Sequence, residues 1–102
     1  MNKNIIDNAI LYVKNFFKNE STVHDYYHTM RVYNNATHIA IKEHADLGIV
    51  QLSALLHDID DHKISPQTSQ NLDNARSFMK ENGVSDDKIE QICEIIGEIS
   101  FS

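Results

Sequence analysis

The feature that most constrains this chain is a run of apolar residues that ends abruptly in charged ones. Between Leu47 and Leu56 nearly every residue is apolar, and at helical spacing these side chains cover almost the whole circumference. A helix that is apolar all round lies at the centre of its fold. The run stops at His57-Asp58, and more titratable residues follow, namely Asp60, Asp61, His62 and Lys63. Either this helix reaches the protein surface at its end, or the residues at its end are the ligands of a binding site.

The remaining residues predict further helices around this central one. One proline and three glycines leave few breaks, and 41% apolar residues suffice for one packed core in 102 residues. We therefore expect an all-α bundle of five helices. The expected segments are a first helix with apolar positions from Ile5 to Phe17, a second over 25–44, a third over 47–58, a fourth over 68–82 and a fifth after Ser85.

Charge and composition exclude several classes of protein. The net charge of −6 argues against binding to a nucleic-acid polymer, which requires Lys and Arg against phosphates. A small phosphorylated ligand stays possible, because a bound metal ion can supply the positive charge. The single cysteine, Cys93, cannot form an intrachain disulfide, and no stretch approaches the roughly 18 apolar residues of a membrane span. These features predict a cytoplasmic protein without a membrane partner.

The His57-Asp58 doublet predicts a metal site. At the end of a helix both side chains can converge on one point just beyond the terminus. An imidazole and a carboxylate together suit a divalent Mn, Fe, Co, Ni, Zn or Mg ion better than copper(I), which prefers sulfur. Two protein ligands rarely hold such an ion alone, and His28 on the preceding helix is the obvious third.

The spacing of these residues resembles a known family. The segment "HDYYHTMRVYNNATHIA" is followed after a short gap by "LSALLHDIDDHK", so the matching region covers about residues 24–63. This combination resembles the HD superfamily of metal-dependent phosphohydrolases, in particular its small bacterial members. In that family one histidine precedes Arg-Val, as His28 precedes Arg31-Val32, and a His-Asp doublet ends a buried helix.

The resemblance implies a metal ion held by His28, His57 and Asp58 and hydrolysis of a small phosphorylated substrate, with a nucleotide as the first expectation. It implies that Asp61 guides the attacking water, and that Arg31 or Lys63 neutralises phosphate charge. The family's fourth ligand, an Asp on a later helix, has no counterpart in this sequence. The terminal "EIIGEISFS" is still apolar-patterned, so we expect residues 1–102 to form one HD-type domain that is incomplete at its C-terminal end.

Several alternatives stay open on the sequence alone. Asp60 and Asp61 are each either a water-guiding carboxylate or a solvated loop residue, and His24 either lines the site or helps to begin its helix. Arg31 could instead form a structural salt bridge. The chain as a whole could be a non-catalytic HD-type module that binds a metal or nucleotide, or a helical interaction domain. An exposed stripe of isoleucines in the last helix would favour a homo-oligomer. Its members are Ile92, Ile95, Ile96 and Ile99.

Overall fold

The computed structural model describes residues 4–99, and within that range all regular elements are helices. They are α1 (Ile5–Phe16), α2 (Val23–Lys42), α3 (Leu47–Leu56), α4 (Asp73–Glu81) and α5 (Asp86–Ile99). The expected all-α bundle of five helices is therefore confirmed. None of these helices is long and apolar enough to cross a membrane.

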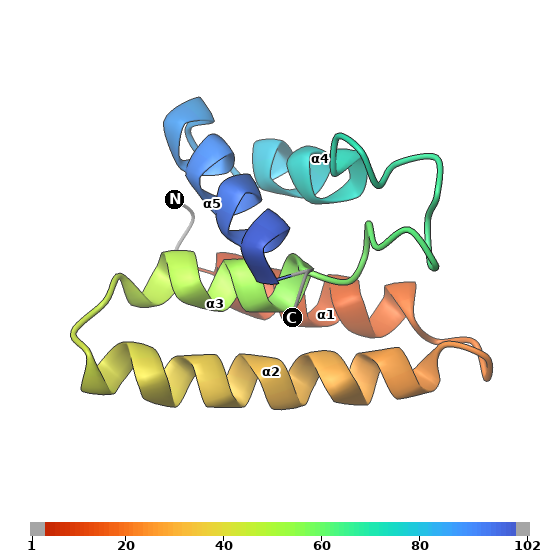
Figure 1. Cartoon of the computed structure of the whole chain (residues 1–102), viewed down its shortest axis with the longest axis horizontal. Helices are drawn as coiled ribbons and strands as arrows, with labels where there is room; N and C mark the ends of the chain where they lie inside the picture. The colour runs from red at the N-terminus through yellow and green to blue at the C-terminus, as the bar shows by residue number, and fades with distance from the viewer. Residues whose placement is uncertain (1–3, 100–102) are drawn as a thin grey trace.

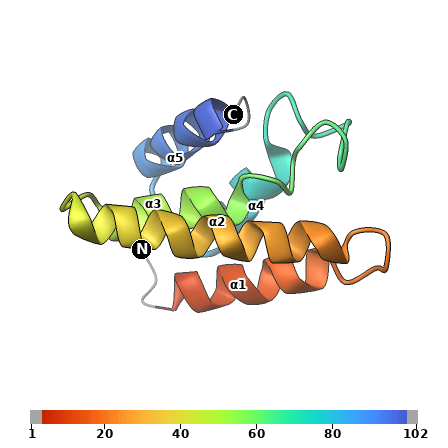
Figure 2. The ribbon, with the colours of Figure 1, turned by 60° about the horizontal axis from the view of Figure 1, so that its bottom comes forward.

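Helix α3 is central, as its all-apolar sequence predicts. It contacts α1, α2 and α5 (Figure 1). Helix α4 packs against α5. In Figure 2 α2 crosses in front of α3, and α1 runs below α2 in the view. The side chains of Leu52, Leu55 and Leu56 are fully buried. Because α3 is covered on several sides, its C-terminal end is held in one place between α2 and the loop that leads to α4.

The helix ends follow local capping chemistry where the sequence supplies it. Asp46 accepts a hydrogen bond from the Ile49 amide at 3.2 Å and so caps α3. Ser85 accepts one from the Lys88 amide at 3.4 Å at the start of α5. Helix α2 begins at Val23 and ends at Lys42, two residues earlier at each end than predicted, and the chain then reverses through His44 with φ 57°.

Two predicted helices are shorter in the structure. Helix α3 ends at Leu56, not at residue 58, so His57 occupies its C-cap and Asp58 lies in the following turn. Helix α4 begins at Asp73, not at residue 68, because the chain from Pro66 to Leu72 forms successive turns. The left-handed conformation of Leu72, with φ 55°, separates these turns from the helix.

The isoleucine stripe of α5 is not exposed as predicted. Ile92 and Ile96 are fully buried in the core, and Ile95 is half-buried against it. The side chain of Ile99 lies outside the described residues. The stripe packs inside the chain itself, so it gives no reason for self-association, and a homo-oligomer stays a prediction.

Candidate metal centre

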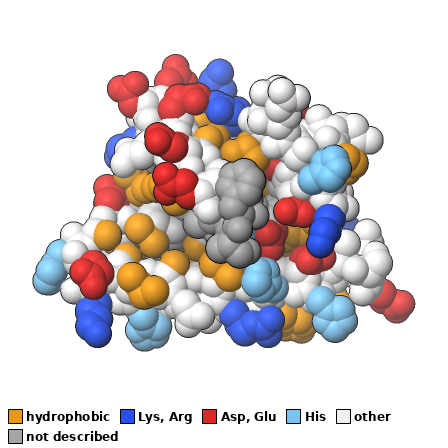
Figure 3. Space-filling model, in the orientation of Figure 1, with side chains coloured by type: hydrophobic (Ala, Val, Ile, Leu, Met, Phe, Trp, Pro, Cys, Tyr) orange, Lys and Arg blue, Asp and Glu red, His pale blue; other side chains and the backbone are white. Residues whose placement is uncertain are grey.

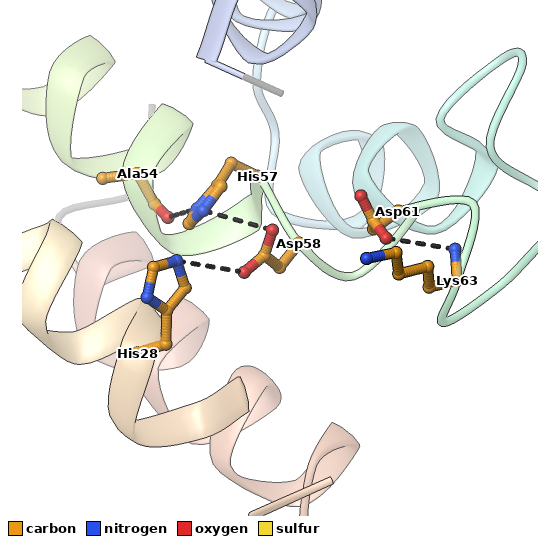
Figure 4. A network of polar contacts seen from close by, with 6 residues as sticks. All are labelled: His28, Ala54, His57, Asp58, Asp61 and Lys63. Carbon is orange, nitrogen blue, oxygen red and sulfur yellow. Dashed lines mark hydrogen bonds and ion pairs between the residues drawn. The ribbon is translucent and has the colours of Figure 1, made fainter. Parts of the chain in front are cut away.

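Three metal-ligating side chains meet where α3 ends beside α2. One nitrogen each of His28 and His57 and one oxygen of Asp58 all lie within 4.8 Å of one another. The Nε2 atom of His28 is 3.7 Å from Asp58 Oδ2, and Nε2 of His57 is 3.2 Å from Asp58 Oδ1 (Figure 4). The structure therefore brings together the three residues that the sequence singled out as ligands. Within residues 4–99 this is the one group of its kind.

The backbone of α3 fixes the orientation and the tautomer of His57. Its Nδ1 lies 2.6 Å from the carbonyl oxygen of Ala54, one turn earlier. A carbonyl oxygen can only accept a hydrogen bond, so Nδ1 carries the proton and, in the neutral ring, Nε2 carries a lone pair. A backbone carbonyl behind the ring is the usual outer support of a metal-binding histidine.

The two atoms that face each other across His57 and Asp58 are both acceptors. The lone pair of His57 Nε2 and the carboxylate oxygen of Asp58 are 3.2 Å apart, which favours a positive charge between them. A proton can provide it, and so can a divalent cation. The Asp58 side chain is 22% exposed and that of His28 51%, so the centre is open to solvent from the α2 side.

The electrostatics of Asp58 also favour a bound cation. Burial raises the pKa of the Asp58 carboxyl, the nearby imidazoles of His57 and His28 lower it, and the negative charges of Asp61 and Asp25 raise it further. The net effect is a raised pKa, so the isolated carboxylate is disfavoured in this place. A bound cation would offset both the burial and the repulsion from the two neighbouring carboxylates.

The donor set fits a first-row divalent ion. Two imidazole nitrogens and one carboxylate oxygen are the combination that zinc and the neighbouring transition metals accept. Three protein donors also leave coordination positions for water or another oxygen ligand. The residues present therefore suit a divalent metal ion.

Asp61 and Lys63 lie in the turn that follows the doublet. Asp61 is half-buried, and its Oδ2 accepts a hydrogen bond from the Lys63 amide at 3.0 Å. Figure 4 shows the Lys63 side chain folded back from the loop toward Asp61 and Asp58. The charge of Asp61 also acts on Asp58. The structure thus places both residues beside the centre, while their predicted roles stay predictions.

Arg31 lies on α2, one turn after His28, and its side chain is exposed. Among the described residues it forms no ion pair, and the structural salt bridge considered for it is not seen there. Its guanidinium is therefore available to an incoming anion. His24, one turn before His28, is also exposed, and its role stays open.

Asp60 is neither a solvated loop residue nor a water guide. Its side chain is 1% exposed and accepts hydrogen bonds from Thr68 Oγ1 at 2.6 Å and from the amides of Asn74 and Ala75 at 3.1 Å and 2.9 Å. The carboxylate caps helix α4 from a distance in sequence. Residue spacing alone could not show this, because the partners come from a separate segment.

Asp25 lies near the centre and was not among the predicted site residues. It precedes His28 by three residues on α2, so the two share a helical face, and its charge acts on Asp58. The three-residue spacing within "HDYYH" was the available signal. Two further carboxylates therefore act on the centre through their charge, Asp25 from α2 and Asp61 from the loop.

Two hollows are lined by residues close to the donors in sequence, although none of the three donors lines either of them. A cavity of about 640 Å³ lies between the 60–72 loop and α5, and Asp61, Arg76 and Glu94 are among its lining residues. An apolar groove of about 300 Å³ runs between α2, α3 and α5 and begins at Val32 and Ala54. In Figure 3 acidic side chains gather over α5 and near the loop, whereas histidines line the α2 edge.

The comparisons with known proteins agree with this geometry. The model of the HD domain family matches residues 25–101, which include all three donors. The chain belongs to the HD domain family. It is also 32% identical over 90 residues to the uncharacterized protein YpgQ of Bacillus subtilis (strain 168). The alignment covers 88% of this chain but 44% of that relative, so the chain spans less than half the length of the relative. No solved structure matches the chain significantly.

Membership of the HD domain family gives the centre its context. The His57-Asp58 doublet lies within the matched residues, and the match to the HD domain points to the metal-dependent phosphohydrolase superfamily. The structure adds what the family match cannot supply. It gives the Ala54 carbonyl behind His57, the two further carboxylates, and the distant cap by Asp60.

Proposed function

We propose that this HD domain is a metal-dependent phosphohydrolase acting on a nucleotide or another phosphate ester or anhydride. The observation that carries the proposal is the convergence of His28, His57 and Asp58 within 4.8 Å, with a lone pair of His57 aimed at the centre. A divalent ion held there would supply the positive charge that polarises a phosphoryl group and acidifies a bound water.

The residues around the centre supply the remaining steps. The oxygen of a water molecule attacks phosphorus, the bond from phosphorus to the leaving oxygen breaks, and Asp61 accepts the proton that the water loses. Arg31 lies on α2, Lys63 lies on the loop after the doublet, and both are exposed. Their positive charges would bind the phosphate and stabilise the charge that develops on its oxygens.

A non-catalytic role is the second candidate, and one observation favours it. Only three protein donors meet among the described residues. A domain that binds a metal or a nucleotide without turnover would need no further ligand. The two candidates share the metal centre and differ in whether phosphate is released.

Turnover on a panel of nucleotides and phosphate esters separates them. The chain, loaded with Mn²⁺ or Co²⁺, should release phosphate or pyrophosphate from at least one compound, and His28→Ala should lose at least 99% of that rate. His38→Ala is the matched control, because His38 is likewise an exposed histidine on α2 but lies away from the centre. Metal binding without turnover would instead support the regulatory role.

The role of Asp61 in guiding the water is tested in the same assay. Asp61→Asn keeps the shape of the side chain and its contact with the Lys63 amide but removes the base. We expect metal binding to persist and the rate to fall by about 10²–10⁴-fold, the usual contribution of a general base. An unchanged rate would remove Asp61 from the mechanism.

A further inference from the structure

Asp60 connects the turn that carries the metal donors to helix α4. Its carboxylate is buried at 1% exposure and uses both oxygens: Oδ1 accepts from Thr68 Oγ1 and the Asn74 amide, and Oδ2 accepts from the Ala75 amide. A buried carboxylate is tolerated only with such partners, and charge-assisted hydrogen bonds are stronger than neutral ones. The three contacts therefore anchor Asp60 firmly.

Helix α4 lacks a cap of its own. The residue at its N-cap position is Leu72, which has no side-chain oxygen and adopts φ 55° and ψ 49°. The first amides of a helix need acceptors from outside the helix, and the dipole there favours a negative charge. Asp60 meets both requirements from twelve positions before Leu72.

The same anchor holds Asp58 and Asp61. Asp58 lies beyond the end of α3, so the helix does not fix it, and a hydrogen bond of 3.2 Å from the Asp61 amide to the Asp58 carbonyl closes the turn. The turn is held on one side by His57, which is buried at the C-cap of α3. On the other side it is held by the bonds of Asp60 to α4.

We propose that Asp60 is a positioning residue for the metal centre, which fixes Asp58 and Asp61 by anchoring their turn to helix α4. The proposal rests on the metal-binding part of the proposed function. A ligand held in place before the ion arrives loses little conformational freedom on binding, whereas a loose turn must be ordered first. Releasing Asp60 should therefore weaken metal binding although Asp60 does not face the centre.

The coupling also acts in the reverse direction. If an ordered helix α4 raises the affinity for the metal, a bound metal must stabilise the ordered state of α4 by the same free energy. The amides of Asn74 and Ala75, which donate to Asp60, should exchange with solvent more slowly when the metal is bound. The Ile49 amide, which donates to Asp46 at the other end of α3, should change less.

The test uses Co²⁺ as the probe, because its visible spectrum reports the geometry of its ligands. The Kd and the spectrum are measured for wild type, Asp60→Asn, Asp60→Ala and Thr68→Val. Removing an outer support of a metal site typically costs 10–100-fold in affinity. We expect about that loss for Asp60→Ala and a smaller loss for Asp60→Asn, which keeps one acceptor oxygen. Thr68→Val, which removes a single bond to Asp60, should also weaken binding.

Ser85→Ala is the control for a loss of stability alone, because it removes the cap of α5 and has no contact with the loop. It should keep the Kd and the spectrum of wild type. If wild type binds Co²⁺ and both Asp60 variants bind it with the same Kd and spectrum, the positioning role is overturned. If Asp60→Ala does not fold, Asp60→Asn and Thr68→Val decide the question. If wild type itself binds no Co²⁺, the metal centre fails and the proposal with it.

Discussion

At the scale of single residues, the side chains of the centre are arranged in a way that favours a bound cation over the stability of the metal-free protein. The half-buried carboxylate of Asp58 faces a lone pair of His57, with further negative charge from Asp61 and Asp25 nearby. Burial and the two neighbouring carboxylates disfavour ionised Asp58 in the metal-free protein, and the imidazoles of His57 and His28 offset this only in part. A bound cation would offset both the burial and the repulsion, which is a physical reason for the arrangement.

Because ionised Asp58 is disfavoured without a cation, we predict that Asp58→Asn stabilises the metal-free protein. Because the pKa of Asp58 is raised in the folded state, the folded protein binds more protons than the unfolded one above the ordinary aspartate value near 3.9, and stability falls as pH rises through that window. Asn avoids this loss, and its amide can donate to His57 Nε2. At pH 7 in chelator we expect a gain of about 0.5–1 kcal/mol in thermal unfolding.

The same variant should show no rise in Tm when Co²⁺ is added, whereas wild type should show one. Thermal unfolding followed by circular dichroism, with chelator and with Co²⁺, measures both effects. A metal-free Asp58→Asn that is clearly less stable than wild type would show that the carboxylate is favourably held without a cation.

Thr29 offers a second prediction at this scale. It follows His28 on α2, is fully buried, and its hydroxyl has no hydrogen-bond partner among the described residues. An unpaired buried polar group costs about 1–3 kcal/mol. Thr29→Val keeps the shape and removes the hydroxyl, so we expect a gain of about 1 kcal/mol and a Tm higher by roughly 4–8 °C.

Thr37→Val is the matched control on the same helix. The Thr37 hydroxyl donates to the Tyr33 carbonyl at 2.8 Å and accepts from Gln51 at 3.3 Å, so its removal should give no gain. Equal shifts in Tm for the two variants would show that the gain comes from valine itself and not from the unpaired hydroxyl.

At the scale of elements, local patterns predicted the helices well and their ends less well. The all-apolar run of α3 specifies a central helix, because burial on every side follows from composition alone. The start of α4 depends on Asp60, whose amide partners lie 14 and 15 residues away. Periodicity contains no information about such a contact, so the helix was predicted to begin five residues too early.

The buried stripe of α5 has a similar explanation. Apolar spacing showed that Ile92 and Ile96 share a face but not what covers that face, and α3 covers it. The candidate site was easier to anticipate. His28, His57 and Asp58 are recognisable because metal chemistry restricts ligand types, whereas Asp25 acts only through its charge and left a weaker signal in the sequence.

The end of α2 gives a prediction for an element boundary. His44 adopts φ 57°, a left-handed conformation that costs a residue with a Cβ roughly 1–2 kcal/mol. Glycine is the usual residue at this position after a helix. His44→Gly removes this strain, but the greater conformational freedom of glycine in the unfolded chain offsets part of the gain. We therefore expect the variant to raise the free energy of unfolding by about 0.5–1 kcal/mol.

Glu43→Gly is the control one position earlier, where φ is −93° and any residue fits. It should lower the free energy of unfolding in urea, because glycine brings only its entropic cost there. If His44→Gly is destabilised to the same extent as Glu43→Gly, the backbone at residue 44 does not carry the strain that its φ indicates.

At the scale of the whole molecule, all five helices contribute to one small centre. Helix α2 supplies His28, and α3 supplies His57 and orients it. Helices α1 and α5 pack against α3, and α4 anchors the turn of Asp58 through Asp60. The sequence carries the ligands, but the fold brings them within reach of one ion. Metal binding should therefore stabilise the whole domain in proportion to the logarithm of metal concentration above the Kd.

The most direct measurement of this account is the metal content of the chain after equilibrium dialysis against Co²⁺ and removal of loosely held ions, measured by elemental analysis at pH 7.5 and at lower pH. We predict about one ion per chain for wild type and His38→Ala and almost none for His57→Ala and Asp58→Ala. The content of wild type should fall as pH is lowered, because protons compete with the metal for its ligand atoms. A wild type that holds no more metal than His57→Ala would contradict the account.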